Sequence, residues 1–219
     1  MRTKLISIAL SLVLFATIAN AQISVGVLGG VNFQNLNGKN YSGDALSNTM
    51  IPGFHAGINV QIPIAPEFYF QPGLLFSTKG AKNEGSVLTT KTNLSYVELP
   101  LNFLYKGHLG NGFVFIGVGP YVAYGVKGKV TTEGGSATLE SPVTFQNVVE
   151  ITDSPLVPYY KALDAGGNIL FGYELSSGIF AQVNAQLGML KINPEYKLLP
   201  DDKSVVKNTG FGVSLGYRF

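Results

Sequence analysis

The sequence has no cysteine, and only two of its 219 residues are histidine. Without cysteine the chain can form no disulfide, no cysteine-linked lipid anchor and no thiolate metal site. Two histidines and carboxylates that are not clustered along the chain do not make a metal-binding pattern either. We therefore predict neither a metal nor a cofactor.

Charge is also scarce, at 13% of residues, and it is balanced. Without Arg2 and Lys4 the 15 basic residues become 13, equal to the 13 acidic ones. A neutral chain has no electrostatic surface for nucleic acid, so that partner class is excluded. Apolar residues make up 46%, yet no run after the first 21 residues approaches the ~20 apolar residues of a membrane-spanning helix.

The first 21 residues have the pattern of a secretory signal peptide. Arg2 and Lys4 precede an apolar run over residues 5–18, and Ala19-Asn20-Ala21 is a small-x-small cleavage site. An uncleaved anchor is the alternative, but the run is short and no stop-transfer charges follow it. We predict a signal peptide over 1–21, cleavage near Ala21, and one domain over 22–219.

Eight runs of alternating apolar and polar residues cover most of the remaining chain. In one of them Phe54, Ala56 and Ile58 share a face opposite His55 and Gly57. Period-two alternation predicts β-strands with one apolar and one polar face. The runs are residues 24–33, 54–62, 68–77, 96–105, 112–126, 163–174, 179–189 and 211–219.

The connections between the runs alternate in length. Long connections lie at 34–52, 79–93, 127–161 and 191–207, and short ones at 63–67, 107–111 and 176–178. Outer-membrane barrels have long external loops, short periplasmic turns and, with an even strand number, both termini in the periplasm. The sequence thus predicts an all-β fold, an eight-stranded antiparallel up-and-down transmembrane β-barrel. Ten strands are the alternative, should residues 127–161 contain another hairpin.

Three prolines fall inside predicted strands, at Pro72, Pro100 and Pro120. Proline removes a ladder hydrogen bond, and a closed barrel has no edge strand to accommodate it. We expect β-bulges at these positions.

Four segments together resemble a known family. They are Tyr96-Val97-Glu98-Leu99-Pro100-Leu101, Gly117-Val118-Gly119-Pro120-Tyr121, Asp164-Ala165-Gly166 leading to Gly172-Tyr173-Glu174-Leu175, and Gly216-Tyr217-Arg218-Phe219. In this order they resemble the PorT-like outer-membrane β-barrel family, common in Bacteroidetes, over residues 22–219. The resemblance implies a barrel in the cell outer membrane. Its named member belongs to a protein-secretion apparatus, but fold analogy does not establish a function.

The alternation places four charged residues on the inner face: Glu98, Asp164, Glu174 and Arg218. Glu174 and Arg218 both fall at the periplasmic end and are a plausible ion pair. We favour a structural polar network, because an eight-stranded barrel is only wide enough for its own side chains. A narrow, ion-selective channel is the alternative.

His55 also faces inward, and hairpin geometry brings Ser77 close to it. A histidine and a serine within hydrogen-bond reach would suit a lipid-modifying enzyme, but the sequence offers no acid to orient the base. We therefore predict a hydrogen-bonded lumen histidine and no catalytic residues. Lys79, Lys82 and Lys91 are assigned to the second external loop, where they would meet anionic headgroups or water.

Aromatic residues near the run ends suit the girdles at the two membrane interfaces. They are Phe33, Phe54, Phe68, Tyr69, Tyr105, Phe113, Tyr124, Tyr173, Phe211, Tyr217 and Phe219. Tyr217 and the final Phe219 also fit the C-terminal signal read by the barrel-assembly machinery.

These patterns favour a non-enzymatic outer-membrane barrel whose four external loops contact lipid, surface polymer or protein partners. Expected partners are outer-membrane lipid, the barrel-assembly machinery during biogenesis, and surface or secretion-apparatus proteins. A porin-like channel, a lipid-modifying enzyme and a soluble lipocalin-like barrel are the competing hypotheses. The last is disfavoured, because one face is almost purely apolar and the other is too polar for an apolar ligand cavity.

Overall fold

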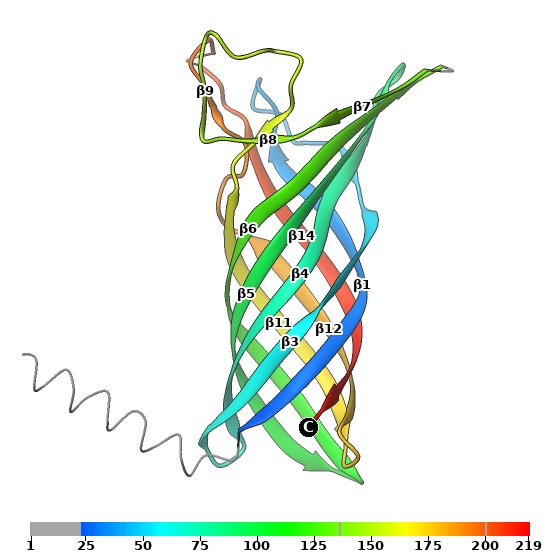
Figure 1. Ribbon diagram of the computed structural model, residues 1–219, viewed down its shortest axis with the longest axis vertical. Helices are drawn as coiled ribbons and strands as arrows, with labels where there is room; N and C mark the ends of the chain where they lie inside the picture. The colour runs from blue at the N-terminus through cyan, green and yellow to red at the C-terminus, as the bar shows by residue number, and fades with distance from the viewer. Residues whose placement is uncertain (1–22, 136, 200) are drawn as a thin grey trace, which may run out of the picture.

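The computed structural model describes residues 23–135, 137–199 and 201–219, so the predicted signal peptide lies outside the described part. Eight antiparallel strands close into a ring, each paired to its neighbours (Figure 1). They are β1 (Ser24–Lys39), β3 (Ile51–Ala65), β4 (Phe68–Glu84), β5 (Thr89–Leu109), β6 (Gly112–Gly134), β11 (Leu163–Leu175), β12 (Ile179–Gly188) and β14 (Val205–Arg218). The pairing of β11 with β6 closes the ring, which confirms the predicted eight-stranded barrel.

Six short strands lie outside the ring. They are β2 (Asn48–Thr49), β7 (Ala137–Pro142), β8 (Thr144–Phe145), β9 (Val148–Val149), β10 (Tyr159–Tyr160) and β13 (Glu195–Tyr196). The connection over 127–161 does contain an added hairpin, because β7 pairs with the outer end of β6. That hairpin projects above the barrel and adds no strand to the ring, so the ten-strand alternative is wrong (Figure 1).

On the side of the long connections, the strands extend further beyond the membrane than the alternation indicated. β4 and β5 remain paired up to Glu84 and Thr89, so the predicted second loop over 79–93 shrinks to a four-residue turn. Above the membrane the outward-facing positions of these strands are polar or glycine, while inward positions such as Ala81 and Leu94 are apolar, so the alternation typical of a membrane strand disappears. The three lower connections are short, and two of their residues with positive φ, Gly110 and Gly178, are glycines suited to tight turns.

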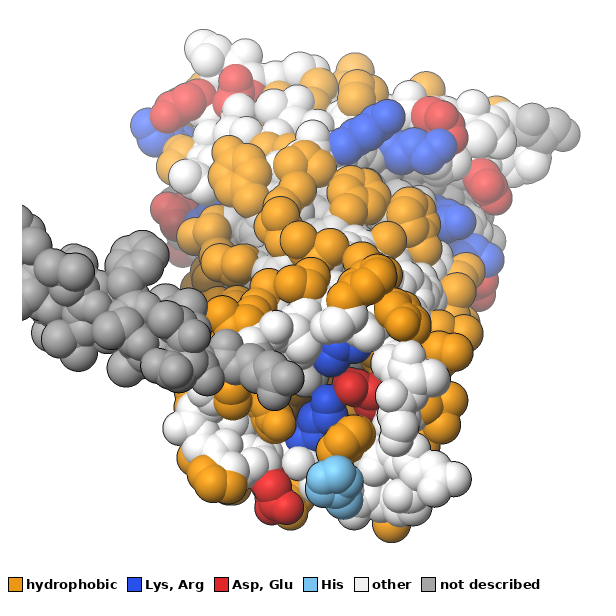
Figure 2. All heavy atoms as spheres, turned by 60° about the horizontal axis from the view of Figure 1, so that its bottom comes forward, with side chains coloured by type: hydrophobic (Ala, Val, Ile, Leu, Met, Phe, Trp, Pro, Cys, Tyr) orange, Lys and Arg blue, Asp and Glu red, His pale blue; other side chains and the backbone are white. Residues whose placement is uncertain are grey.

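The outer wall is the apolar face predicted from the alternation. Aromatic pairs lie across neighbouring strands, including Phe33 with Phe211 and Phe68 with Tyr105, at ring-centroid distances of 5.2 and 5.4 Å. Hydrophobic side chains cover much of the wall seen from below (Figure 2). The soluble lipocalin-like hypothesis is wrong for the same reason, since the barrel presents its apolar face outward.

The prolines do not produce the expected bulges. Pro72 pairs with Leu101 and Pro100 with Tyr121, and the ladder keeps its register on both sides. Proline removes one hydrogen bond without inserting a residue, so the ladder is locally interrupted but not shifted. The register shifts lie instead at Ser95/Tyr96 and Pro63/Ala65.

No helix among the described residues is long and apolar enough to cross a membrane.

Candidate functional site: the barrel lumen

The lumen is filled in layers. From the periplasmic mouth upward these are a lower charged network, an apolar layer, an amide-lined chamber, an upper charged network and an apolar cap beneath the external loops. Each layer is built from inward positions of several strands, so residues far apart in sequence meet at one height.

The lower network consists of Lys106, Glu174 and Arg218. Glu174 binds Lys106 Nζ at 2.7 Å with one carboxylate oxygen and Arg218 Nε at 2.9 Å with the other. Arg218 also donates to Asn59 Oδ1 at 3.0 Å, and its guanidinium lies 5.2 Å from the Phe180 ring. Charged side chains are visible inside the lower mouth of the barrel (Figure 2). One acid between two cations gives this network a net charge of +1.

The apolar layer above it packs against glycines. Its members are Leu28, Leu104, Phe115, Leu170 and Phe180. A Cβ added at Gly117 would come within 2.1 Å of the Leu104 side chain, and one at Gly216 within 2.2 Å of Phe180. Leu104 and Phe180 are the direct cross-strand partners of Gly117 and Gly216, so these glycines make room for large side chains from the neighbouring strands, and those side chains fill the lumen at this height.

The chamber is a cavity of about 40 Å³. Its walls are mainly amides, including Asn32, Gln34, Gln71 and Asn168, and each of these four has a buried polar atom without a protein partner. A water needs roughly 10–15 Å³ of such space and several polar partners. The chamber therefore suits a few ordered waters and is too small for an organic ligand.

His55 lies in the chamber wall, and its imidazole Nε2 is 2.7 Å from Ser214 Oγ. Ser77 is the cross-strand neighbour of His55, as expected, but its hydroxyl accepts a hydrogen bond from Asn32 at 3.2 Å. His55 is 6% exposed and Ser214 1%, so lipid on the outer wall cannot reach them. Within the described lumen no carboxylate hydrogen-bonds to the imidazole, so the third member of a catalytic triad is absent there.

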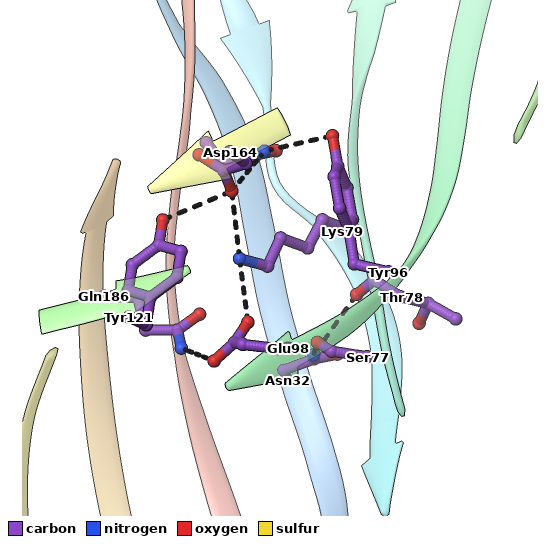
Figure 3. A network of polar contacts seen from close by, with 10 residues as sticks. Asn32, Ser77, Thr78, Lys79, Tyr96, Glu98, Tyr121, Asp164 and Gln186 are labelled. Carbon is purple, nitrogen blue, oxygen red and sulfur yellow. Dashed lines mark hydrogen bonds and ion pairs between the residues drawn. The ribbon is translucent and has the colours of Figure 1, made fainter. Parts of the chain in front are cut away.

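The upper network surrounds Lys79 (Figure 3). Lys79 Nζ points between Glu98 Oε2 at 3.0 Å and Asp164 Oδ2 at 3.2 Å, and all three side chains are at most 1% exposed. The ammonium also lies 4.3 Å from the Tyr121 ring centroid. One cation between two acids gives this network a net charge of −1, opposite to the lower one.

Neutral donors stabilise the two acids of the upper network. Tyr121 Oη donates to Asp164 at 3.3 Å and Asn208 Nδ2 donates to the same oxygen at 2.9 Å. Gln186 donates to Glu98 (Figure 3). These donors compensate for the second negative charge, which a buried pair alone would leave uncompensated.

The sequence placed Glu98, Asp164, Glu174, Arg218 and His55 inside the barrel, and the structure places all five there. It missed the two cations that pair with them. Lys79 was assigned to an external loop and is instead the most buried lysine, because β4 continues through it as a strand. Lys106 was not assigned to any site, because it lies next to the predicted turn over 107–111. Its even number, like those of Glu98 and Asn102 on the same strand, indicated an inward-facing position.

Two aromatics predicted for the girdles also face the lumen. Lys106 Nζ lies 5.8 Å from the Tyr69 ring and 4.8 Å from the Phe113 ring. They belong to the packing of the lower network. Tyr217 and Phe219 lie on the outer wall, with their rings 4.9 Å apart.

The apolar cap consists of Leu36, Ala81, Leu94, Tyr96, Tyr121, Ala123 and Ile192. Above this cap, the third and fourth external connections fold against each other. Within the third connection, β8 pairs in parallel with β10. β9 of the third connection pairs in parallel with β13 of the fourth, and this pairing joins residues 143–162 to residues 189–204. Ion pairs link the same segments, Lys161 to Glu195 at 3.3 Å and Lys197 to Glu150 at 2.8 Å. We call these two segments, as far as they are described, the external platform.

Among the described residues no group of three or more histidines and carboxylates could hold a metal ion. The buried charges pair with one another instead. The lumen formed by the described residues can hold water and fix charges, but those residues present neither a substrate-sized cavity nor an accessible nucleophile there.

The model of a family described as outer membrane protein beta-barrel domain matches residues 18–192. No curated protein matches the chain in sequence.

Solved outer-membrane proteins are similar over most of the chain. Ail, the attachment invasion locus protein of Yersinia pestis, is 9% identical with a TM-score of 0.39, covering 90% of this chain and 98% of that one. Neisserial surface protein A is 13% identical with a TM-score of 0.43, covering 90% and 95%. Ail in complex with the heparin analogue sucrose octasulfate is 11% identical with a TM-score of 0.40, covering 90% and 99%.

Proposed function

The chain belongs to the outer membrane protein β-barrel domain family, and we propose that it is a non-enzymatic anchor for the external platform. It is an outer-membrane β-barrel protein, which follows from the family and from the fold. In this role the barrel of the protein holds the platform at the cell surface, where the platform contacts surface polymer or protein partners.

The filled lumen is the observation that carries this proposal. Two charged networks and an apolar layer occupy the barrel from end to end, and the chamber between them measures about 40 Å³. An eight-stranded barrel filled in this way has no aqueous path, which disfavours the channel. The buried His55–Ser214 contact, without access to lipid, disfavours the enzyme.

The platform has the surface expected of a contact site. Large apolar side chains project from it into solvent, with Ile151, Leu156 and Leu198 exposed by 65%, 86% and 61%. Beside them lies a cavity of about 250 Å³ whose walls include Val149, Tyr159 and Leu199. Exposed apolar groups held by paired strands are typical of surfaces that bind a partner.

Finer assignments belong to the same proposal. We assign the chain to the PorT-like branch on the strength of the Tyr96–Leu101 string, with secretion-apparatus proteins as one partner class. We propose that residues 1–21 are removed by signal peptidase and that the barrel-assembly machinery reads Tyr217 and Phe219. Mass spectrometry of the mature protein tests the cleavage, with Gln22 as the expected first residue.

Planar-bilayer recording tests the proposal most directly. We expect no single-channel conductance from the purified, heat-modifiable barrel, because the lumen has no continuous water path. A reproducible conductance would overturn the anchor in favour of a channel. In cells, a photo-crosslinking residue at position 156 should give adducts with polymer or protein. The same residue at position 116, on the lipid-facing wall, is the control.

The enzyme alternative has its own test. Replacing His55 by alanine should leave the lipid composition of the outer membrane unchanged while the heat-dependent gel shift persists. A changed lipid profile with an intact barrel would contradict the non-enzymatic assignment.

A further inference from the structure

A pocket opens on the outer wall of the barrel where β12 ends beside β14 and β1. Pairing between β12 and β14 stops at Leu187 with Thr209, whereas β14 and β1 stay paired through Asn37–Lys207 to Lys39–Val205. The wall therefore has a step at this height. The pocket has a volume of about 350 Å³, and we call it the lysine notch. Its lining includes Asn37, Lys39, Leu187, Gly188, Lys207 and Thr209.

The described lining of the notch contains two lysines and no carboxylate. Lys39 and Lys207 are diagonal cross-strand neighbours, whose side chains start roughly 7–8 Å apart. Among the described residues, no carboxylate lies within 4 Å of either ammonium, and the notch lining contains no acidic residue. Thr209 Oγ1 in the same wall is buried and has no hydrogen-bond partner in the protein. Two ammoniums without a carboxylate partner suit an anion with several oxygens, such as a phosphate.

The height of the notch on the barrel wall indicates which kind of molecule would carry such a phosphate. Leu187 in its floor is 58% exposed. The stacked rings of Phe33 and Phe211 lie one step below on the lipid-facing wall. Aromatic pairs of this kind mark the membrane interface, and headgroups lie immediately above it. An anion in the notch therefore sits at headgroup level with an apolar wall directly beneath.

Three other lysines above the membrane do not share this setting. Lys82 and Lys129 are paired with Glu84 and Glu140. Lys91 is unpaired among the described residues but projects from the β5 extension, outside the notch lining. Lys91 thus offers the same charge without the pocket.

We propose that the lysine notch binds the phosphate of a lipid in the external leaflet, with an acyl chain along Leu187 and Phe211. This rests on the membrane-anchor part of the proposed function and is independent of any platform partner. The notch would fix one anionic lipid against the barrel at the foot of the platform.

Native mass spectrometry of the full barrel in a phosphate-free maltoside micelle tests the site. The probe is phosphatidic acid, compared with diacylglycerol of the same chains and with inorganic phosphate. We expect one retained phosphatidic acid per barrel. Lys39→Gln and Lys207→Gln should each weaken retention about five-fold, since a lysine near a charged membrane surface contributes about that factor. Lys91→Gln should leave it unchanged.

Each other outcome overturns the inference in a different way. Equal retention of diacylglycerol would mean that the tails bind without the phosphate. Full competition by inorganic phosphate would mean an anion site without a lipid. An equal loss in Lys91→Gln would mean diffuse charge attraction. The heat-dependent gel shift of every variant reports separately on the barrel, so a failed anchor is distinguishable from a failed notch.

Discussion

The two charged networks in the lumen have inverse compositions. The lower one places a single acid, Glu174, between two cations, and the upper one places a single cation, Lys79, between two acids. The lower side chains are 4–8% exposed near the periplasmic mouth, while the upper ones are at most 1% exposed. In both, the central residue makes two ion pairs and each outer residue makes one. The comparison predicts that the unfolding free energy lost on removing a charged residue depends on whether that residue is the central or an outer member of its network.

Removing the central residue should have the largest effect. Lys79→Met leaves Glu98 and Asp164 buried side by side, and Glu174→Gln leaves Lys106 and Arg218 unpaired. Breaking a buried ion pair costs about 3–5 kcal/mol of unfolding free energy. We expect both variants in this range, with Lys79→Met at the upper end because water cannot reach its site. Urea unfolding in detergent measures it, with the surface variant Lys91→Met as control.

Removing an outer residue should matter much less. Glu98→Gln leaves Lys79 paired with Asp164, and Lys106→Met leaves Glu174 paired with Arg218, so each network becomes neutral. We expect losses of about 1.5–3 kcal/mol in unfolding free energy, the net contribution of a hydrogen bond to a charged group. If the outer and central variants lose equal stability, position within the network is not what matters.

Filling the apolar layer should have an intermediate-to-small effect. Gly216→Ala places a methyl group within 2.2 Å of the nearest Phe180 ring atom, and overpacking of this kind costs about 1–3 kcal/mol. Phe180→Leu in the same chain should restore part of the loss by making room. Gly135→Ala is the backbone control with space around it, although its positive φ adds strain of its own. Absence of rescue by Phe180→Leu would contradict close packing between the networks.

An exposed ion pair should have the smallest effect. In the hairpin above the membrane, the hydrogen bond and charge of Lys129 hold the pKa of Glu140 below its usual value. A depressed folded-state pKa gives stability that is present above the unfolded pKa and is lost as the pH falls through the folded one. We expect an NMR titration of Glu140 to shift back toward the usual pKa in Lys129→Gln. Global stability should not change measurably, since exposed pairs contribute little.

The alternation predicted the strand faces because lipid imposes them. Every outward position of a transmembrane strand must be apolar, which is why Val31, Ile58 and Val213 identified the outer wall without any tertiary information. The same parity placed His55, Glu98 and Asp164 inside. Above the membrane that constraint ends, so the extensions of β4, β5 and β6 were read as loops, and Lys79 was misplaced with them.

The alternation did not predict the hydrogen-bond partner of His55 inside the lumen. Parity shows that His55 faces inward, but its hydrogen bond goes to Ser214, 159 residues later, and not to its hairpin neighbour Ser77. Strand tilt and stagger decide which inward side chains meet at one height, and neither can be read from a single strand.

The sequence by itself determined the strand number and the two faces, because lipid constrains the outward positions of each strand separately. The lengths of the connections predict the orientation in the membrane. The sequence also predicted the Glu174–Arg218 pair and a filled lumen. Only the tertiary structure showed that Lys79 and Lys106 pair with the buried acids, how the lumen is layered, and that two external connections join into a platform. Those features depend on contacts between strands distant in sequence, and closure of the ring alone brings such strands together.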